Sequence, residues 1–217
     1  YVLAGWGMFK LGRNLKIEAW PSLALALLYT FSGFMVGTAQ IFPFIIGATW
    51  LPYILNYFIK LYRNPSWADG LMLILVTALT ILGAYPAFMI ITFYLFVFFF
   101  AFYFWMHRKS RLMSVKGIYL GLGLSLGILW LCGGYFWALL ECFPYISRSE
   151  VLPYDWIFYY TSFTFQCSLS FLFPFATALR TEFFDSDLSM LNGYVGLLTW
   201  PIIIFYSVHA KGKIKYG

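Results

Sequence analysis

The residues best suited to chemistry lie in one short segment, "ECFPYISRSE", which follows a long apolar stretch. The segment contains Glu141, Ser147, Arg148 and Glu150. A guanidinium at the level of the lipid headgroups suits a phosphate or pyrophosphate, because its planar donors match the oxygens of such an anion. Arg148 could instead pair with either of the two glutamates. The sequence leaves both interpretations open.

A second group of charged residues follows further along the chain. Arg180 lies close in sequence to Glu182, Asp185 and Asp187, and Asp155 precedes them. Carboxylates in such a group could bind a divalent metal ion through their oxygens. They could equally form a solvated loop. We treat Asp155, Asp185 and Asp187 as candidates for a metal or acceptor side of a site, and the sequence does not name a metal.

The composition places these residues in a membrane protein. The chain has 217 residues, of which 62% are hydrophobic and only 10% are charged, whereas soluble domains carry about 25% charged residues. Such a chain is integral to the membrane and surrounded by lipid. The formal charge of +6 does not indicate nucleic-acid binding, because the basic residues lie in short clusters at the ends of apolar runs.

The apolar runs predict an all-α, polytopic bundle of about six to seven membrane helices, since a spanning helix needs about 20 apolar residues. The first run is too short to span and predicts the cut end of a helix. We therefore expect one membrane domain, 1–217, that is part of a longer chain. The predicted helical ranges are 1–9, 20–39, 44–59, 70–82, 87–106, 117–140 and 193–208.

The distribution of Lys and Arg predicts the orientation. One side, taken as cytoplasmic, receives 12 of the 14 basic residues, in the ranges 10–16, 60–63, 108–116 and 211–215. The range 141–192 then forms a non-cytoplasmic loop with six of the eight acidic residues. Within it, 156–177 is long enough to span. Its Tyr, Ser and Thr content and Pro174 instead indicate an interfacial or re-entrant element on the outer face.

The uncharged range 70–106 is too long for one crossing and folds back at "GAYP". Pro86 cannot continue a helix, and Gly83 supplies a favourable helix end. Because the first helix of the pair is short, we expect the turn to lie below the outer surface. The turn could form a recess that serves as a binding cleft, or it could be a plain tight turn where the membrane is thin.

Other classes of function find little support in the sequence. No motif of a soluble hydrolase, nucleotide-binding protein or zinc enzyme is present. His107 and His209 lie at predicted helix ends. The predicted spans carry almost no ionisable residues, which disfavours a transporter. Three separated cysteines are typical of apolar packing, although Cys142 and Cys167 could pair.

Several short motifs follow one another in a definite order along the chain. They are Tyr29, Ser32, Gly33 and Phe34; Trp50, Leu51 and Pro52; Gly83 and Pro86; Ser147 and Arg148; and Tyr194 and Gly196. Their order and spacing resemble the YfhO-like bacterial membrane proteins within the GT-C superfamily of polytopic glycosyltransferases. The resemblance covers roughly 24–204.

The resemblance implies transfer of a sugar from a polyprenyl-phosphate carrier on the non-cytoplasmic face of a bacterial inner membrane. The family's catalytic acid lies in a loop that would precede Tyr1, so no catalytic residue is assigned in this chain. The turn with Tyr85 and the pair Ser147–Arg148 would border the groove for lipid phosphate and sugar. Glu141 and Arg180 are further candidates for that groove. The alternative is a non-catalytic membrane scaffold or a subunit that binds other membrane proteins.

Overall fold

The computed structural model of the chain consists of helices. It describes residues 1–106, 111–145, 164–173, 193, 194, 196, 199–201 and 204, with backbone alone for 111–116. No β-strand occurs in this part of the chain, and the predicted all-α membrane bundle is confirmed. The chain divides into two compact units, one of Tyr1–Thr30 with Ala39–Val151 and one of Phe31–Thr38 with Leu152–Gly217. The prediction of one membrane domain, 1–217, stays a prediction.

The first unit contains six helices and a short 3-10 turn. Their bounds are α1 (Val2–Asn14), α2 (Ala19–Thr30), α4 (Phe42–Arg63), α5 (Trp67–Gly83), α6 (Pro86–Met106), α7 (Arg111–Cys142) and η1 (Phe143–Tyr145). The second unit contains α3 (Gly33–Gly37) and the 3-10 helix η2 (Phe165–Phe171).

Four segments of the described chain are long and apolar enough to cross a membrane, which makes the protein integral and multi-pass. They are Ala19–Gly37, Phe42–Arg63, Pro86–Met106 and Gly117–Tyr145. The helix α5, Trp67–Gly83, is apolar but shorter. Of the predicted last span, 193–208, only 193, 194, 196, 199–201 and 204 are described.

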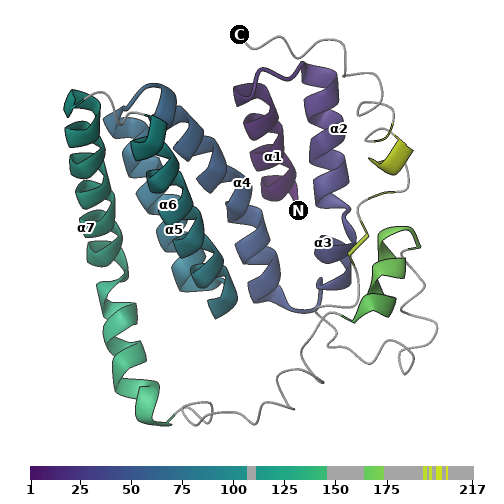
Figure 1. Cartoon of the computed structure of the whole chain (residues 1–217). Coiled ribbons are helices and arrows are strands. Elements are labelled where there is room, and N and C mark those ends of the chain that lie inside the picture. The colour runs from purple at the N-terminus through teal and green to yellow at the C-terminus, as the bar shows by residue number, and fades with distance from the viewer. Residues whose placement is uncertain are drawn as a thin grey trace. The chain divides into compact units, whose positions relative to one another are not determined.

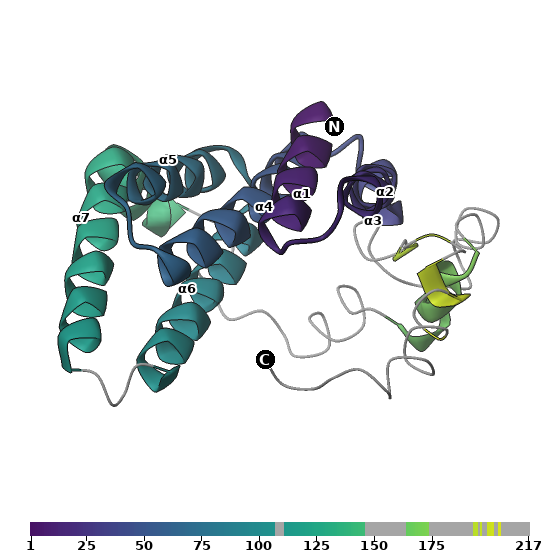
Figure 2. The same cartoon turned by 90° about the horizontal axis from the view of Figure 1, so that it is seen from above.

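The helices of the first unit form a single layer with one helix beside it. The layer runs in the order α2, α1, α4, α5, α7, and each helix packs on the next (Figure 1). Seen from above, α6 lies on one face of this layer, against α4, α5 and α7 (Figure 2). Half of the spanning window of α4 is buried, against 17% for α6. The apolar side chains of α6 therefore contact mainly lipid.

An aromatic core joins α4 to α6. The ring of Phe58 stacks on Phe99 at a centroid distance of 4.5 Å and meets the edge of Phe96 at 4.6 Å. Buried residues of α4, α5 and α7, including Leu61, Leu73 and Leu124, complete the cluster. Offset-stacked and edge-to-face pairs favour such contacts beyond the area that they bury.

Small residues let α1 approach α2 closely. A Cβ added to Gly5 would lie 2.7 Å from Oγ1 of Thr30, and one added to Gly12 would lie 2.9 Å from Oγ of Ser22. The hydrophobic effect does not drive helices together inside a membrane. Small residues favour helix association there because they allow close backbone packing. The hydroxyl of Thr30 is satisfied within its own helix, because it donates to the carbonyl of Ala26 at 2.7 Å.

The structure divides the predicted span 20–39. Helix α2 ends at Thr30 and α3 begins at Gly33. Ser32 has an extended backbone, and its Oγ accepts a hydrogen bond from the N–H of Met35 at 3.4 Å. This is the conformation of an N-cap, in which a serine oxygen satisfies an otherwise unpaired helical N–H. Ser32 was the signal for this break that the predicted span 20–39 did not take into account.

Candidate functional site

The turn between α5 and α6 is fixed by backbone hydrogen bonds. The N–H of Ala84 donates to Thr80 at 2.9 Å and ends α5, while the N–H of Tyr85 donates to the carbonyl of Pro43 at 3.3 Å. Because Pro86 disfavours a helical conformation in the residue before it, the chain turns here and α6 restarts at the proline. The second of these hydrogen bonds ties the turn to the beginning of α4.

The side chain of Tyr85 lies on the first turn of α4. Its ring stacks on Phe44 with a centroid distance of 4.9 Å, and Phe44 meets the edge of Phe88 at 6.2 Å. The Tyr85 side chain is 38% exposed. Its hydroxyl has no hydrogen-bond partner in the part of the chain that the structure describes. Tyr85 therefore has a fixed ring and an available polar atom.

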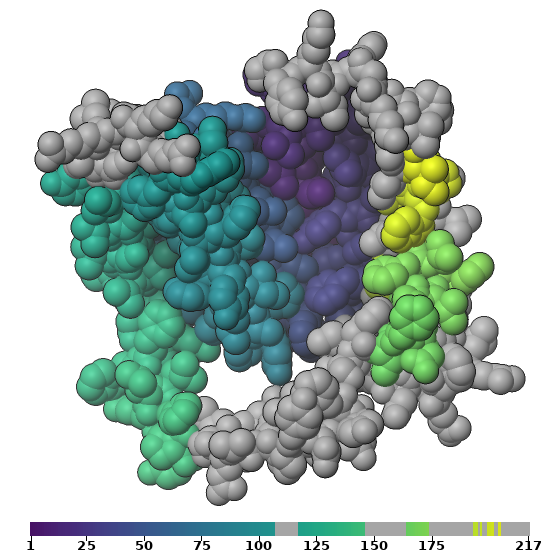
Figure 3. All heavy atoms as spheres, viewed as in Figure 1, coloured from purple at the N-terminus to yellow at the C-terminus, as the bar shows by residue number. Residues whose placement is uncertain are grey.

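The end of α7 runs past this turn. Gly127 lies against Ile74, and Cys132 packs with Ile81. Helices α5 and α7 are parallel with a constant rise, so Gly83 lies level with Phe136. The residues from Trp137 to Cys142 thus extend beyond α5, and the space-filling view shows the last turns of α7 projecting past α5 and α6 (Figure 3).

Glu141 lies on the projecting part of α7. Its Oε1 accepts a hydrogen bond from Nε1 of Trp137 at 2.7 Å, and both side chains are exposed. Tyr85 and Glu141 therefore lie at the same end of the helical layer, and the groove between them stays a prediction. This hydrogen bond orients the carboxylate along the helix and leaves its second oxygen available.

The other predicted site residues lie outside the described chain. These are Ser147, Arg148, Asp155, Arg180, Asp185 and Asp187. Among the residues that are described, no three of His, Cys, Asp and Glu come together to hold a metal ion. A divalent metal at Asp155, Asp185 and Asp187 stays a prediction. Cys132, Cys142 and Cys167 are all free, and only Cys142 is exposed.

The sequence did not indicate a polar contact that forms beside Pro52 of α4. Pro52 lies inside α4 and has no N–H, so the carbonyl of Ala48, four residues earlier, loses its helical donor. The hydroxyl of Tyr29 on α2 donates to this carbonyl at 2.6 Å. Tyr29 and Pro52 were already noted as motif residues, but nothing in the sequence indicated that they act on the same acceptor.

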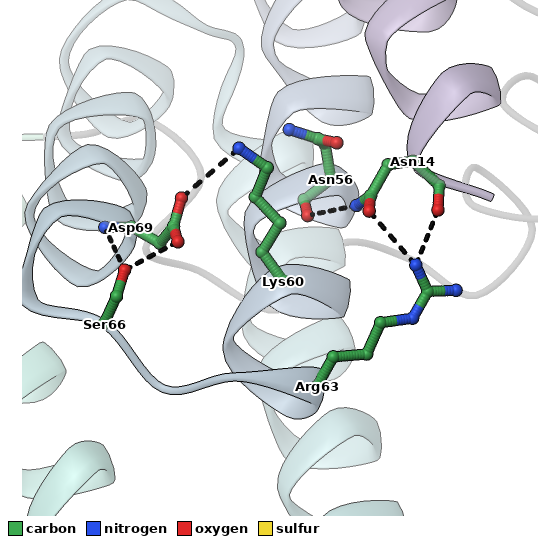
Figure 4. A network of polar contacts seen from close by, with 6 residues as sticks. All are labelled: Asn14, Asn56, Lys60, Arg63, Ser66 and Asp69. Atoms are coloured by element: carbon green, nitrogen blue, oxygen red, sulfur yellow. Dashed lines mark hydrogen bonds and ion pairs between the residues drawn. The ribbon is translucent and has the colours of Figure 1, made fainter. Parts of the chain in front are cut away.

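A second network that the sequence did not reveal lies at the opposite end of the layer. Nη1 of Arg63 donates to the backbone carbonyl of Asn14 at 2.6 Å and to its Oδ1 at 3.2 Å, and Asn14 Nδ2 donates to the carbonyl of Asn56 at 3.1 Å (Figure 4). The capping box Ser66-x-x-Asp69, which opens α5, was a usable signal for part of this network. The ends of α1 and α4 meet here, so 10–16 and 60–63 lie at one end of the layer; the side of the membrane that this end faces stays a prediction.

In the second unit, two motif segments also meet. The N–H of Gly33 donates to the carbonyl of Tyr194 at 2.6 Å. The N–H of Gly193 donates to Oγ of Ser170 at 2.9 Å, next to η2. Within 164–173 the chain forms only η2, with Cys167 and Ser170 buried. The interfacial or re-entrant nature of 156–177 stays a prediction, because its remaining residues lie outside the described chain.

No family model, curated protein or solved structure matches this chain. The resemblance to YfhO-like proteins therefore stays a prediction.

Proposed function

We propose that this protein transfers a sugar from a polyprenyl-phosphate carrier on the non-cytoplasmic face of a bacterial inner membrane. The observation that carries the proposal is the position of the α5–α6 turn. The turn ends short of α7, and the projecting end of α7 with Glu141 lies at the same end of the layer as Tyr85. The headgroup of a lipid-linked sugar lies at the membrane surface, and a turn that ends before its neighbouring helix would leave space for it there.

Access from the bilayer supports the same proposal. A polyprenyl carrier stays in lipid and must enter a site sideways. Around the turn, the side chains of Leu82, Tyr85 and Ile90 are exposed in the first unit. A carrier chain could lie along these residues while its phosphate reaches Tyr85. In this proposal Tyr85 donates a hydrogen bond to the phosphate, and Ser147 and Arg148 complete the anion site.

The test uses the full-length protein in detergent with a radiolabelled polyprenyl-phosphate sugar. We expect saturable binding and release of the labelled sugar to an acceptor. Arg148→Ala should weaken carrier binding about 10- to 100-fold, the range for a charge-assisted hydrogen bond. Tyr85→Phe should weaken it about threefold to tenfold. Tyr94→Phe, at an exposed tyrosine on α6, is the matched control and should leave binding unchanged.

The proposal fails if the protein neither binds nor turns over any polyprenyl-phosphate sugar. Unchanged carrier affinity in Arg148→Ala would show that Arg148 does not bind the carrier phosphate. It would not exclude the transfer reaction, because other residues could bind the phosphate. An equal loss in Tyr85→Phe and Tyr94→Phe would show that the tyrosine hydroxyls act through general folding rather than at the carrier phosphate.

A second candidate is a non-catalytic membrane subunit, and one observation favours it. The end of α7 and the following 3-10 turn expose large apolar side chains at Trp137, Leu140, Phe143 and Tyr145. Such a patch suits a membrane partner. Co-purification of a partner in fixed ratio, and its loss in Leu140→Asp, would favour this function. A protein that purifies alone with carrier-transfer activity would exclude it.

A further inference from the structure

The end of the layer opposite Tyr85 carries a group of basic side chains that we call the basic end. It consists of Arg13, Lys16 and Arg63; Lys10 lies one turn further into the layer, and Lys60 lies beside the group in an ion pair with Asp69. The ammonium group of Lys10 lies 5.5 Å from the ring centroid of Trp6. Arg13, Lys16 and Arg63 lie where α1 and α4 end.

Arg63 is held in place by contacts to its own chain. Its Nη1 donates two hydrogen bonds, to the carbonyl and to the side-chain oxygen of Asn14. Asn14 is fixed in turn by its hydrogen bond to Asn56. Nη2 and Nε of Arg63 have no partner among the described residues. A guanidinium that is already ordered loses little entropy when it binds an anion through its remaining donors.

Lys16 occupies a backbone position that favours glycine. Its φ is 64°, in the left-handed region. The N–H of Lys16 donates to Arg13 at 3.1 Å, and the N–H of Ile17 donates to Gly12 at 3.1 Å. These are the two hydrogen bonds of a Schellman motif, whose left-handed residue is usually glycine. A lysine here retains a positive charge at the expense of backbone strain, and strain of this kind accumulates at functional positions.

Among the described residues, no carboxylate neutralises Arg13, Lys16 or Arg63. The described chain has one ion pair, between Lys60 and Asp69 at 3.4 Å. Glu18 is the other described carboxylate at this end, and it forms no ion pair within that part of the chain. Arg13 donates to the backbone carbonyl of Ile17, at 2.9 Å. Favourable interaction with helix dipoles accounts for Arg13 and Arg63 at the ends of α1 and α4, but it does not account for Lys16, which lies beyond the helix.

Two tryptophans mark this end as a membrane boundary. Trp20 opens α2 with 81% of its side chain exposed, and Trp67 opens α5 with 92% exposed. Tryptophan is enriched at the level of the lipid headgroups. The basic end therefore lies where headgroup phosphates lie, and its uncompensated positive charge is complementary to an anionic lipid.

We propose that the basic end binds the phosphate of an anionic phospholipid. Arg63 supplies the oriented donors, and Arg13 and Lys16 supply further positive charge beside it. This site is separate from the proposed carrier site at Tyr85, because it lies at the other end of the helices. Its ligand is a component of the bilayer rather than a reactant.

The test compares two lipids with identical acyl chains on the full-length protein in detergent. Native mass spectrometry measures how much phosphatidylglycerol and how much phosphatidylcholine remain bound. We expect phosphatidylglycerol to bind more tightly. Lys16→Gly should weaken phosphatidylglycerol binding about fivefold, the value for one cationic side chain near an anionic surface, and should leave phosphatidylcholine binding unchanged. Lys16→Gly also relieves the strained φ, so unfolding cannot explain a loss of binding.

The matched control removes the ion pair without changing the net charge. The double variant Lys60→Gln with Asp69→Asn should bind phosphatidylglycerol as the unmodified protein does. Equal binding of the two lipids, or wild-type affinity in Lys16→Gly, would overturn the proposal. Displacement of phosphatidylglycerol by inorganic phosphate would also overturn it, because the site would then bind free phosphate rather than a lipid. Persistent lipid binding in the presence of inorganic phosphate supports it.

Discussion

The hydroxyl of Tyr29 donates at 2.6 Å to the carbonyl of Ala48, the acceptor that Pro52 leaves without a helical donor. In lipid, no water is present to satisfy such a carbonyl, so a proline inside a spanning helix requires a partner from another helix. Tyr29 supplies that partner from α2. The proline inside α4 and the position of α2 are thus two parts of one interaction.

Replacement of this hydroxyl tests the interaction directly. Tyr29→Phe should lower the free energy of unfolding by about 1–3 kcal/mol, because a buried acceptor is left unsatisfied. Unfolding in detergent, followed by circular dichroism, measures the change. In a Pro52→Ala background the loss should shrink, since the restored N–H of residue 52 can donate to Ala48. Equal losses in both backgrounds would show that Tyr29 stabilises the protein in another way.

Gly7 on α1 should be intolerant of any side chain. A Cβ at this position would overlap the ring of Tyr53, and the ring cannot move aside freely because its hydroxyl donates to the carbonyl of Leu3 at 2.9 Å. Gly7→Ala should cost about 1–3 kcal/mol of unfolding free energy.

Gly123 on α7 is the matched control for Gly7. A Cβ added there meets no atom within 4 Å. Gly123→Ala should be neutral or stabilising by up to about 1 kcal/mol, the difference in helix propensity. A comparable loss in the two variants would mean that glycine is required for helix insertion rather than for contact with Tyr53.

Two buried threonines on α5 should respond oppositely to removal of the hydroxyl. Oγ1 of Thr77 has no hydrogen-bond partner in the described structure, whereas Oγ1 of Thr80 donates to Val76 at 2.9 Å. Thr77→Val should raise the free energy of unfolding by about 1 kcal/mol, and Thr80→Val should lower it by about 0.5–1.5 kcal/mol. Chemical unfolding of both variants in one detergent gives the comparison. A loss in Thr77→Val would indicate an ordered water at that hydroxyl.

Cysteine labelling tests the predicted orientation. Cys142 is exposed at the end of α7, while Cys132 and Cys167 are buried. A membrane-impermeant maleimide added to intact spheroplasts should label one cysteine, and Cys142→Ser should abolish the signal. Labelling only after the membrane is opened would place the end of α7, and with it Tyr85 and Glu141, on the cytoplasmic side.

The sequence predicted the membrane helices and which helix ends lie together, because both depend on local composition. The length of an apolar run sets a membrane helix, and clusters of Lys and Arg at alternate ends assign its side. The contact between Arg63 and Asn14 agrees with the predicted grouping. Helix α5 is longer than the predicted 70–82. Because Ser66 is its N-cap, the helix begins at Trp67, and it ends at Gly83.

The missed features depend on contacts between distant segments. The hydrogen bond from Tyr29 to Ala48 joins two residues 19 positions apart on different helices, and no local pattern encodes it. The break before α3 did have a local signal, because Ser32 is a preferred N-cap residue within an otherwise apolar run. For the candidate site, the groove at Tyr85 and Glu141 stays a prediction. The anion-binding role of Arg148 and Arg180 rests on residue chemistry alone.

The contact between Tyr29 and Ala48 also bears on how the chain enters the membrane. A ribosome delivers α2 to the translocon before α4, so the donor is already present when the acceptor arrives. If α4 left the translocon alone, its Ala48 carbonyl would meet hydrocarbon without a partner. Because α2 is synthesised first, its Tyr29 hydroxyl is available to satisfy the Ala48 carbonyl when the proline-containing α4 inserts.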